Sequence, residues 1–359
     1  MRDKCFKLAI WGLMICLFSG INAQDPQFSQ FYNSSLYYNP ATAGISPDLR
    51  LSSSYRNLWS GIPGDISSYF LSVDYQWAKK NVGIGFLMMN NNEGLHRLST
   101  QRAELIYSYR IQSKYRLLQF GMTAFSINIR DFKKDGFIFT DQLDPIYGVI
   151  QQSSFVSDEV EPVIYPDWNA GMVYRQNFKD KKITPTIGIS ASHIFRPNIS
   201  FLNNKIRLPV KYVVHSSVLT RFAINGKDVW DRKFVFLNPG FVYEHQDPFQ
   251  TFTFGSGFDV YPIHFGTWFR TRNFLTDLHK FNSVIINVGV ILPVMLNHNL
   301  LIDYTYDSTV SKLEFASGGA HEITLIYNIS LPERKHPVDC GEFEWWRVGK
   351  GVKYYSKKK

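Results

Sequence analysis

The stretch Leu71-Ser72-Val73-Asp74-Tyr75-Gln76-Trp77 decides the fold class. Its odd-numbered positions carry Leu, Val, Tyr and Trp, whereas its even-numbered positions carry Ser, Asp and Gln. Successive side chains of a β-strand point to opposite faces, so one face of this segment meets an apolar environment and the other a polar one. The same alternation returns in residues 103–111, 300–306 and 323–329. The pattern predicts an all-β protein.

Working outward from this stretch, fourteen segments of the same kind lie between residues 49 and 331, and bacterial single-chain barrels use even strand numbers. They are 49–57, 66–77, 82–90, 100–111, 116–129, 167–177, 184–195, 209–222, 233–245, 250–261, 264–273, 281–292, 299–306 and 320–331. Their connections tend to alternate in length. Short ones include 78–81, 112–115 and 178–183, and long ones include 58–65, 91–99, 130–166, 196–208 and 307–319.

Outer-membrane barrels have short periplasmic turns and longer outer loops. The alternation therefore predicts a transmembrane antiparallel β-barrel of about 14 strands, with an inward N-terminus. Two connections depart from the rule, since 223–232 is long and 246–249 is short.

A soluble β-sandwich or β-propeller explains the alternation of side chains equally well. It explains less well the strand lengths, the alternating loop lengths and the aromatic residues near strand ends, which are typical of membrane-interface girdles. These residues are Tyr75, Trp77, Tyr107, Tyr109, Tyr243, Tyr261, Tyr304, Tyr306 and Tyr327. We therefore favour the membrane barrel.

The two ends of the chain have a different composition from the barrel. Residues 1–23 carry a basic start, an apolar run and a small residue at Ala23, which predicts a signal peptide cleaved near Ala23. The apolar run is shorter than the roughly 20 residues that a transmembrane helix needs. Residues 24–48 are expected to form a short hatch with a helical turn, in or under the lumen. Residues 332–359 form a basic, aromatic tail expected in the periplasm, either as a disordered, solvated end or as a docking peptide for an envelope partner or the inner leaflet.

Composition excludes several function classes. The net charge of +9 is spread along the chain apart from the tail, so it does not indicate a nucleic-acid partner. After cleavage Cys340 is the remaining cysteine, which leaves no internal disulfide. The nine histidines show no zinc-ligand spacing, and no phosphate-binding loop or nucleophile elbow occurs. We expect no catalytic residue, no metal and no cofactor.

Charged residues on the polar strand face are more informative. They are Asp74, Arg102, Glu104, Arg110 and Asp303. Charge inside a barrel is tolerated where it is paired or wet. These residues indicate either a packed, salt-bridged lumen or the lining of a pathway.

Three blocks of sequence resemble the PorP/SprF family over about residues 25–331. The opening block contains Asp25, Pro26, Gln27 and Phe28, followed by Asn39 and Pro40. The next contains Tyr55, Arg56 and Trp59, and the closing block contains His321 and Glu322. Leu58 and the tail depart from the family pattern.

The resemblance implies an outer-membrane barrel of the type IX secretion and gliding-motility machinery. It implies as partners the C-terminal domain of a secreted adhesin, and periplasmic peptidoglycan-binding or secretion-system lipoprotein components, alongside outer-membrane lipid. The implied role is to support export or surface anchoring of the adhesin.

Partner surfaces are predicted at the third outer loop and at the tail, because aromatic residues dominate interface hot spots. The loop residues are Tyr147, Phe155 and Tyr165, and the tail residues are Trp345, Trp346, Tyr354 and Tyr355. One alternative is a channel for hydrophobic small solutes that resembles the fatty-acid transporter superfamily, with an apolar pocket beside residues 24–48. Another is a hydrolase embedded in the barrel, which requires lumenal groups that converge.

Overall fold

The structure is a computed structural model. It describes residues 25–46, 48–77, 80–94, 98–113, 115–132, 140–144, 146–150, 161–178, 183–201, 205–223, 234–272, 281–295, 298–310 and 317–330. The proposed signal peptide and the tail at 332–359 lie outside these residues.

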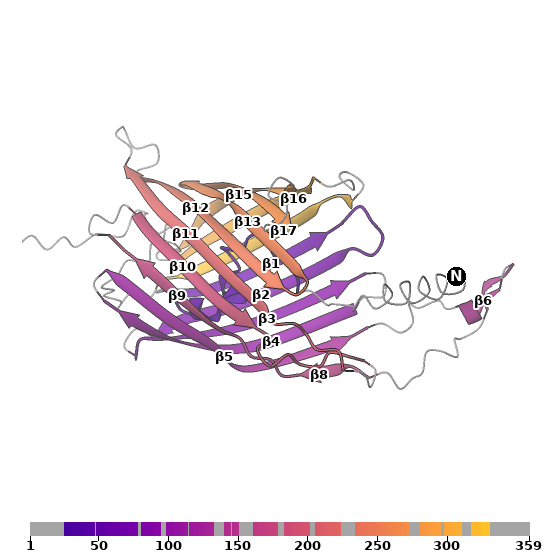
Figure 1. The fold of residues 1–359 in the computed structure, drawn as a ribbon. Coiled ribbons are helices and arrows are strands. Elements are labelled where there is room, and N and C mark those ends of the chain that lie inside the picture. Colours follow the sequence, from indigo (N-terminus) through magenta and orange to yellow (C-terminus); the bar gives the residue numbers. More distant parts are fainter. Residues whose placement is uncertain are drawn as a thin grey trace, which may run out of the picture.

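Fourteen antiparallel strands form a closed barrel (Figure 1). They are β1 Leu49–Leu58, β2 Ile66–Trp77, β3 Val82–Glu93, β4 Leu98–Gln112, β5 Arg116–Asp131, β9 Ala170–Gln176, β10 Ile183–Ser192, β11 Lys211–Ala223, β12 Phe234–Gln246, β13 Phe249–Val260, β14 Ile263–Arg272, β15 Phe281–Met295, β16 His298–Thr309 and β17 Ala320–Ile329. Each strand pairs with its neighbours in sequence, and β1 closes the barrel on β17, with Leu49 opposite Ile329.

The predicted fold class is therefore confirmed, and the soluble sandwich and propeller are excluded. One predicted strand was wrong at its start. Residues 167–177 were expected to form one strand, but β9 begins at Ala170 and a separate short strand, β8 (Val163–Tyr165), pairs with the upper part of β5. Between them the chain turns inward and buries Asp167 and Asn169. The alternation of residues did not reveal the interruption between β8 and β9, because both strands pair with β5.

The third long loop also contains ordered structure. A 3-10 turn, η4 (Thr140–Gln142), leads into a small hairpin of β6 (Leu143–Asp144) and β7 (Gly148–Val149). In Figure 1 this hairpin stands away from the barrel wall, at the end where the long loops lie. We call the two ends of the barrel the long-loop end and the short-turn end.

The two faces of the wall have opposite chemistry. On β4 the side chains of Arg102, Glu104 and Arg110 are buried inside, whereas Tyr107 and Tyr109 are exposed outside. A soluble protein rarely exposes a contiguous apolar surface of this extent, but a lipid-facing barrel wall does. No helix among the described residues is long and apolar enough to span a membrane.

The hydrophobic core lies inside the barrel. Residues 25–46, which we call the plug, contain α2 (Ser35–Tyr38) and η1 (Pro40–Thr42) and are almost wholly buried. Phe28, Phe31 and Tyr38 of the plug pack with inward residues of the wall such as Phe70 and Trp268. A barrel of this strand number encloses space that wall side chains alone leave open, and the plug fills much of it.

Candidate functional site: the plugged lumen

The plug runs along the lumen from one end of the barrel towards the other. The backbone N–H of Asp25 donates to Oε1 of Gln246 at 3.0 Å, and Gln246 ends β12 at the long-loop end. The backbone N–H of Gly44 donates to Oδ2 of Asp74 at 3.0 Å, near the short-turn end of β2. The first described residue therefore lies towards the long-loop end, and the chain then descends to enter β1.

Asn39 fixes both the local shape of the plug and its attachment to the wall. Its Oδ1 accepts from the N–H of Ala41 at 2.9 Å and so caps η1, where Pro40 takes the first position. Proline suits that position because a backbone N–H there would have no acceptor within the helix, so its absence costs no hydrogen bond. The Nδ2 of Asn39 donates to the carbonyl oxygens of Met172 and Ile189, both at 3.2 Å. One side chain thus caps the turn and holds it against β9 and β10.

A glycine in the wall permits this close approach. A Cβ built on Gly121 of β5 would overlap the backbone of Pro40 and Ala41. Glycine has no Cβ, so the wall and the plug backbone can touch directly at this point.

Wall side chains bind the plug through its backbone. Arg110 donates to the carbonyl oxygen of Gly44 at 2.6 Å, and Gln119 donates to that of Ala43 at 2.7 Å. Ser108 also donates to Ala43 at 2.8 Å, and Ser190 of β10 donates to Tyr38 at 2.6 Å. A buried carbonyl without a partner is costly, so these contacts fix the depth of the plug.

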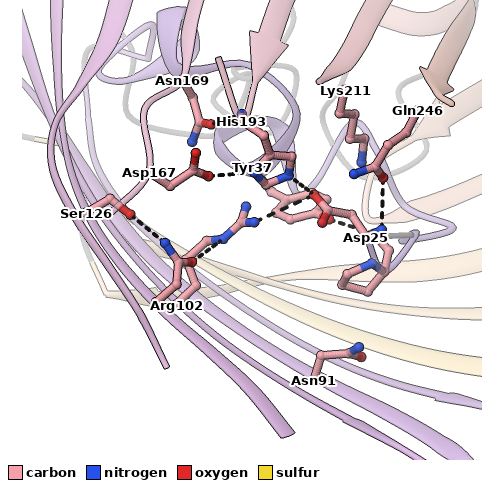
Figure 2. A network of polar contacts seen from close by, with 12 residues as sticks. Asp25, Tyr37, Asn91, Arg102, Ser126, Asp167, Asn169, His193, Lys211 and Gln246 are labelled. Atoms are coloured by element: carbon pink, nitrogen blue, oxygen red, sulfur yellow. Dashed lines mark hydrogen bonds and ion pairs between the residues drawn. The ribbon is translucent and has the colours of Figure 1, made fainter. Parts of the chain in front are cut away.

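The first cluster of charges, the Asp25 network, joins the start of the plug to three parts of the wall. Its members are Asp25, Arg102, Asp167, Asn169 and His193, which Figure 2 labels, together with Glu104. Oδ2 of Asp25 lies 2.8 Å from Nε2 of His193 and 3.6 Å from Arg102. Arg102 also lies 3.6 Å from Glu104, and Asn169 donates to both oxygens of Glu104 at 3.0 Å. Charges buried in this way are tolerated because each is paired or hydrogen-bonded.

His193 is held on both sides by carboxylates. Its Nδ1 lies 2.6 Å from Oδ2 of Asp167, while its Nε2 contacts Asp25. Ionised carboxylates only accept hydrogen bonds, so this arrangement favours the ring with protons on both nitrogens. Burial alone would lower the pKa of His193, but the charge of Asp25 and the hydrogen bonds to Asp167 and Asp25 raise it to about 9. Burial would raise the pKa of Asp25, but His193 and Arg102 hold it well below the ordinary value.

The backbone of His193 is also unusual. It lies one residue beyond β10 and has a φ of 58°, in the left-handed region that non-glycine residues rarely adopt. That conformation costs roughly 1–2 kcal/mol for an L-residue. The paired contacts of the ring offset this cost and aim the imidazole into the lumen.

A second cluster, the Arg56 network, holds the plug at Ser29, a few residues after Asp25. Arg56 lies 3.1 Å from Oδ2 of Asp307 and 3.3 Å from Oε2 of Glu322, and Arg270 lies 2.7 Å from the same oxygen of Asp307. Glu322 also accepts the backbone N–H of Ser29 at 2.6 Å. The family residues Arg56 and Glu322 therefore pair with each other and with the plug.

The remaining motif residues have other places. Gln27 donates to Thr251 at 2.7 Å, and the carbonyl oxygen of Pro26 accepts from the Tyr37 hydroxyl at 2.7 Å. Phe28 is buried in the lumenal core. Tyr55 packs against Tyr69 of the outer face, with ring centroids 4.8 Å apart and ring planes tilted by 37°.

Trp59 and His321 lie at the long-loop end of β1 and β17. The N–H of Trp59 donates to the carbonyl oxygen of Gly319 at 2.8 Å, with φ at 64°. His321 contacts the Tyr304 hydroxyl at 2.7 Å on the outer face. Neither side chain belongs to the lumenal networks.

The predicted partner residues separate into exposed, buried and undescribed groups. Tyr147 is 79% exposed in the turn between β6 and β7. Tyr165 is buried at 6% exposure and packs against Ile199 and Leu208, so its ring is not available to a partner and we withdraw it from the partner surface. Outside regular strands, the alternation of residues does not tell which side chains are buried. The burial of Tyr165 therefore could not be predicted from the sequence. Phe155, Trp345, Trp346, Tyr354 and Tyr355 lie outside the described residues.

The sequence did not identify several residues of the lumen. Four of them are charged and face inward, namely Lys211, Glu244, Arg270 and Asp307. The alternation along the strands that pointed to Arg102 could have pointed to these residues too. Asp167, Asn169 and His193 fall inside the predicted strands 167–177 and 184–195, but they lie outside β9 and β10, where alternation no longer fixes the direction of a side chain. Within the described part of the chain, no group of three or more His, Cys, Asp or Glu side chains is arranged to hold a metal ion.

Comparison with known proteins adds one informative match. The family model described as type IX secretion system membrane protein PorP/SprF matches residues 21–327. Proteins of curated function give no match.

Several solved outer-membrane barrels are similar in fold. The toluene transporter TodX of P. putida is 9% identical with a TM-score of 0.45, over 84% of this chain and 95% of that chain. CdiB from Acinetobacter baumannii is 9% identical with a TM-score of 0.40, over 79% and 59%. Omp33 of Acinetobacter baumannii is 6% identical with a TM-score of 0.37, over 79% and 99%. These values are too low to carry an argument about function.

Proposed function

Because this chain belongs to the PorP/SprF family of type IX secretion system membrane proteins, we propose that it supports export or surface anchoring of a large secreted adhesin. The chain is an outer-membrane β-barrel. In the proposed role it acts without catalysis, as a docking component for the C-terminal domain of the adhesin. We also propose that the long-loop end faces the cell surface, where outer-membrane barrels carry their longer loops.

The observation that carries this proposal is the exposed hairpin of the third long loop. Ile146 is 83% exposed and Tyr147 is 79% exposed. Leu143, Val149 and Ile150 of the same hairpin are each more than half exposed. An apolar group exposed outside the lipid-facing wall favours a protein partner, and aromatic anchors are common hot spots.

The hairpin is ordered by its own backbone contacts, so it presents a defined shape. Oδ1 of Asp144 accepts from the N–H of Ile146 at 2.8 Å and of Tyr147 at 2.9 Å. These two hydrogen bonds lower the pKa of the Asp144 carboxyl. The N–H of Ile150 donates to the carbonyl oxygen of Gln142 at 3.0 Å. An ordered loop loses less conformational entropy on binding than a flexible one.

The test is a double substitution at the tip, Ile146→Ser with Tyr147→Ser, followed by pull-down from solubilised membranes and mass spectrometry. Loss of a hot spot worth about 2 kcal/mol lowers affinity roughly thirtyfold. The matched control is Ile62→Ser, an exposed apolar residue on the loop between β1 and β2. Equal recovery of the adhesin from both variants would contradict docking at the hairpin.

For the periplasmic side, we propose that the tail at 332–359 docks peptidoglycan-binding or lipoprotein components. Its composition supports this, since eight Lys or Arg residues against four Asp or Glu give +4, beside five aromatic side chains. The end of β17, Ile329, lies at the short-turn end, which supports a periplasmic position for the segment that follows it. Deleting residues 334–359 should remove these components from the pull-down. Unchanged recovery of every periplasmic partner argues against this role.

A further inference from the structure

Two cavities lie in the lumen beside the plug. The larger, which we call the chamber, has a volume of about 70 Å³ and is lined by Phe31, Tyr32 and Tyr38 of the plug and by Trp268 of the wall, among others. The smaller, which we call the crevice, has about 10 Å³ and lies between Asp25 and the upper parts of β11 to β13. A water molecule needs roughly 10–15 Å³, so the crevice has room for about one and the chamber for several.

The two cavities follow one another along the barrel axis. Gln246 and Phe249 line the crevice, and they flank the β12–β13 connection at the long-loop end. Asp259 and His264 line the chamber, and they flank the β13–β14 connection at the short-turn end. The chamber also reaches Leu301, in the short-turn half of β16.

The linings of the two cavities meet at Lys211 and Tyr38. Lys211 lines the crevice, and its Nζ lies 5.4 Å from the ring centroid of Tyr38, which lines the chamber. The same Nζ is 4.9 Å from the ring of Tyr37 and 2.8 Å from Oε2 of Glu244. Lys211 is 5% exposed, and an ammonium group over aromatic rings is attracted to them. The ion pair and the two rings therefore hold the ammonium group of Lys211 beside Tyr38.

We propose that the crevice and the chamber are the two halves of a narrow path for small uncharged amphipathic solutes, closed by Lys211. This path is separate from partner docking at the hairpin, so either proposal can fail alone.

The lining of the chamber specifies the solute. Tyr32 stacks on Trp268 with ring centroids 5.4 Å apart, and Phe31 meets Trp268 edge-on at 4.9 Å. Leu301 and Ile326 extend the apolar wall. Nε1 of Trp268 is buried and has no hydrogen-bond partner among the described residues. A buried donor without a partner is unfavourable, so a solute with an apolar body and one acceptor oxygen fits this lining.

The first experiment measures conductance. The full-length protein in planar bilayers, with potassium chloride as the probe, is compared with Lys211→Ala. Removing the lysine side chain should join the cavities and raise the current severalfold. Lys80→Ala, an exposed lysine at the short-turn end, is the control and should leave the current unchanged. Equal currents in the wild type and in a folded Lys211→Ala barrel, judged by heat-modifiable gel migration, overturn the path.

A second variant tests whether the current arises at position 211 or from a displaced plug. Lys211→Cys should also conduct, and attaching a bulky thiol reagent at this position should restore closure. A current that this reagent leaves unchanged shows a leak elsewhere and overturns closure at Lys211.

The chamber is tested with phenol, which has one ring and one oxygen. Phenol in the millimolar range should reduce the Lys211→Ala current, and adding Trp268→Phe should weaken that block severalfold because the indole N–H is lost. Absence of block, or a block that Trp268→Phe leaves unchanged, overturns the assigned solute class.

Discussion

Replacing Gly121 by alanine should dislodge the plug while leaving the barrel wall intact. The new Cβ would overlap the backbone of Pro40 and Ala41, well inside the 3.4 Å of ordinary van der Waals contact. The overlapping atoms are backbone rather than the end of a flexible side chain, so a rotamer change cannot relieve the clash. The plug has to withdraw from β5 by about 1 Å.

The cost follows from the hydrogen bonds at this point. Gln119, Ser108 and Arg110 donate to the carbonyl oxygens of Ala43 and Gly44 at 2.7, 2.8 and 2.6 Å. An added 1 Å takes all three beyond hydrogen-bond length. Two neutral bonds at about 1 kcal/mol each and one charged bond at about 2 kcal/mol give a loss of about 4 kcal/mol. Overpacking adds roughly 1–3 kcal/mol where the plug resists moving.

The assay measures how well the plug is protected. Thr42→Cys, a buried plug residue, is introduced with Cys340→Ser, and maleimide labelling of the folded barrel is timed with and without Gly121→Ala. Labelling should accelerate strongly in the Gly121→Ala protein. Gly257→Ala is the matched control, because a Cβ there meets only side chains, with the nearest atom 3.2 Å away on His264. If the two alanine variants label at the same slow rate, the close packing of plug and wall has been misjudged.

Three further outcomes are expected. Arg56→Met leaves two buried carboxylates with less compensation, so the free energy of unfolding by urea in detergent should fall by about 3–5 kcal/mol, and an unchanged midpoint would refute this. The plug contribution of His193, whose pKa is about 9 against 6.5 for an ordinary histidine, is complete below pH 6.5 and is lost as the pH rises through 9. The contribution of Asp25, whose pKa is lowered, is complete above about pH 3.8 and is lost as the pH falls well below that value. The labelling rate of the plug, divided by that of a fully exposed cysteine at the same pH, should therefore rise at both extremes. The rise at alkaline pH should be smaller in Asp25→Asn. Tyr147→Ser should change the free energy of unfolding by less than about 0.5 kcal/mol because the ring is exposed, and a larger change would mean that the hairpin packs on the barrel.

The strands were predictable because their signal is local. Leu71 to Trp77 alternate in sequence because one face of the wall meets lipid and the other the lumen, and this holds for every strand separately. The start of β9 was missed because the inward turn at Asp167 interrupts pairing without changing the partner strand. The burial of Tyr165 was missed because it depends on Ile199 and Leu208, which lie in the next loop.

The sequence identified the family-motif residues but not how they are arranged in space. Asp25, Arg56 and Glu322 were identified by resemblance to the family, which gives no geometry. Their positions near both ends of the described chain gave no sign that Arg56 and Glu322 pair across the barrel closure, 266 residues apart. That pairing depends on β1 lying beside β17.

By itself the sequence determined the membrane barrel, its strand number and the alternation of its faces, since these follow from periodicity within short segments. Only the tertiary structure decided what the barrel contains. Asp25 meets His193 across 168 residues of chain, and Lys211 comes to lie over Tyr38 only when the plug is seated. Such contacts depend on how a closed wall and a threaded segment fit together in space. No local pattern specifies that fit, because every inward position of the wall faces many possible partners.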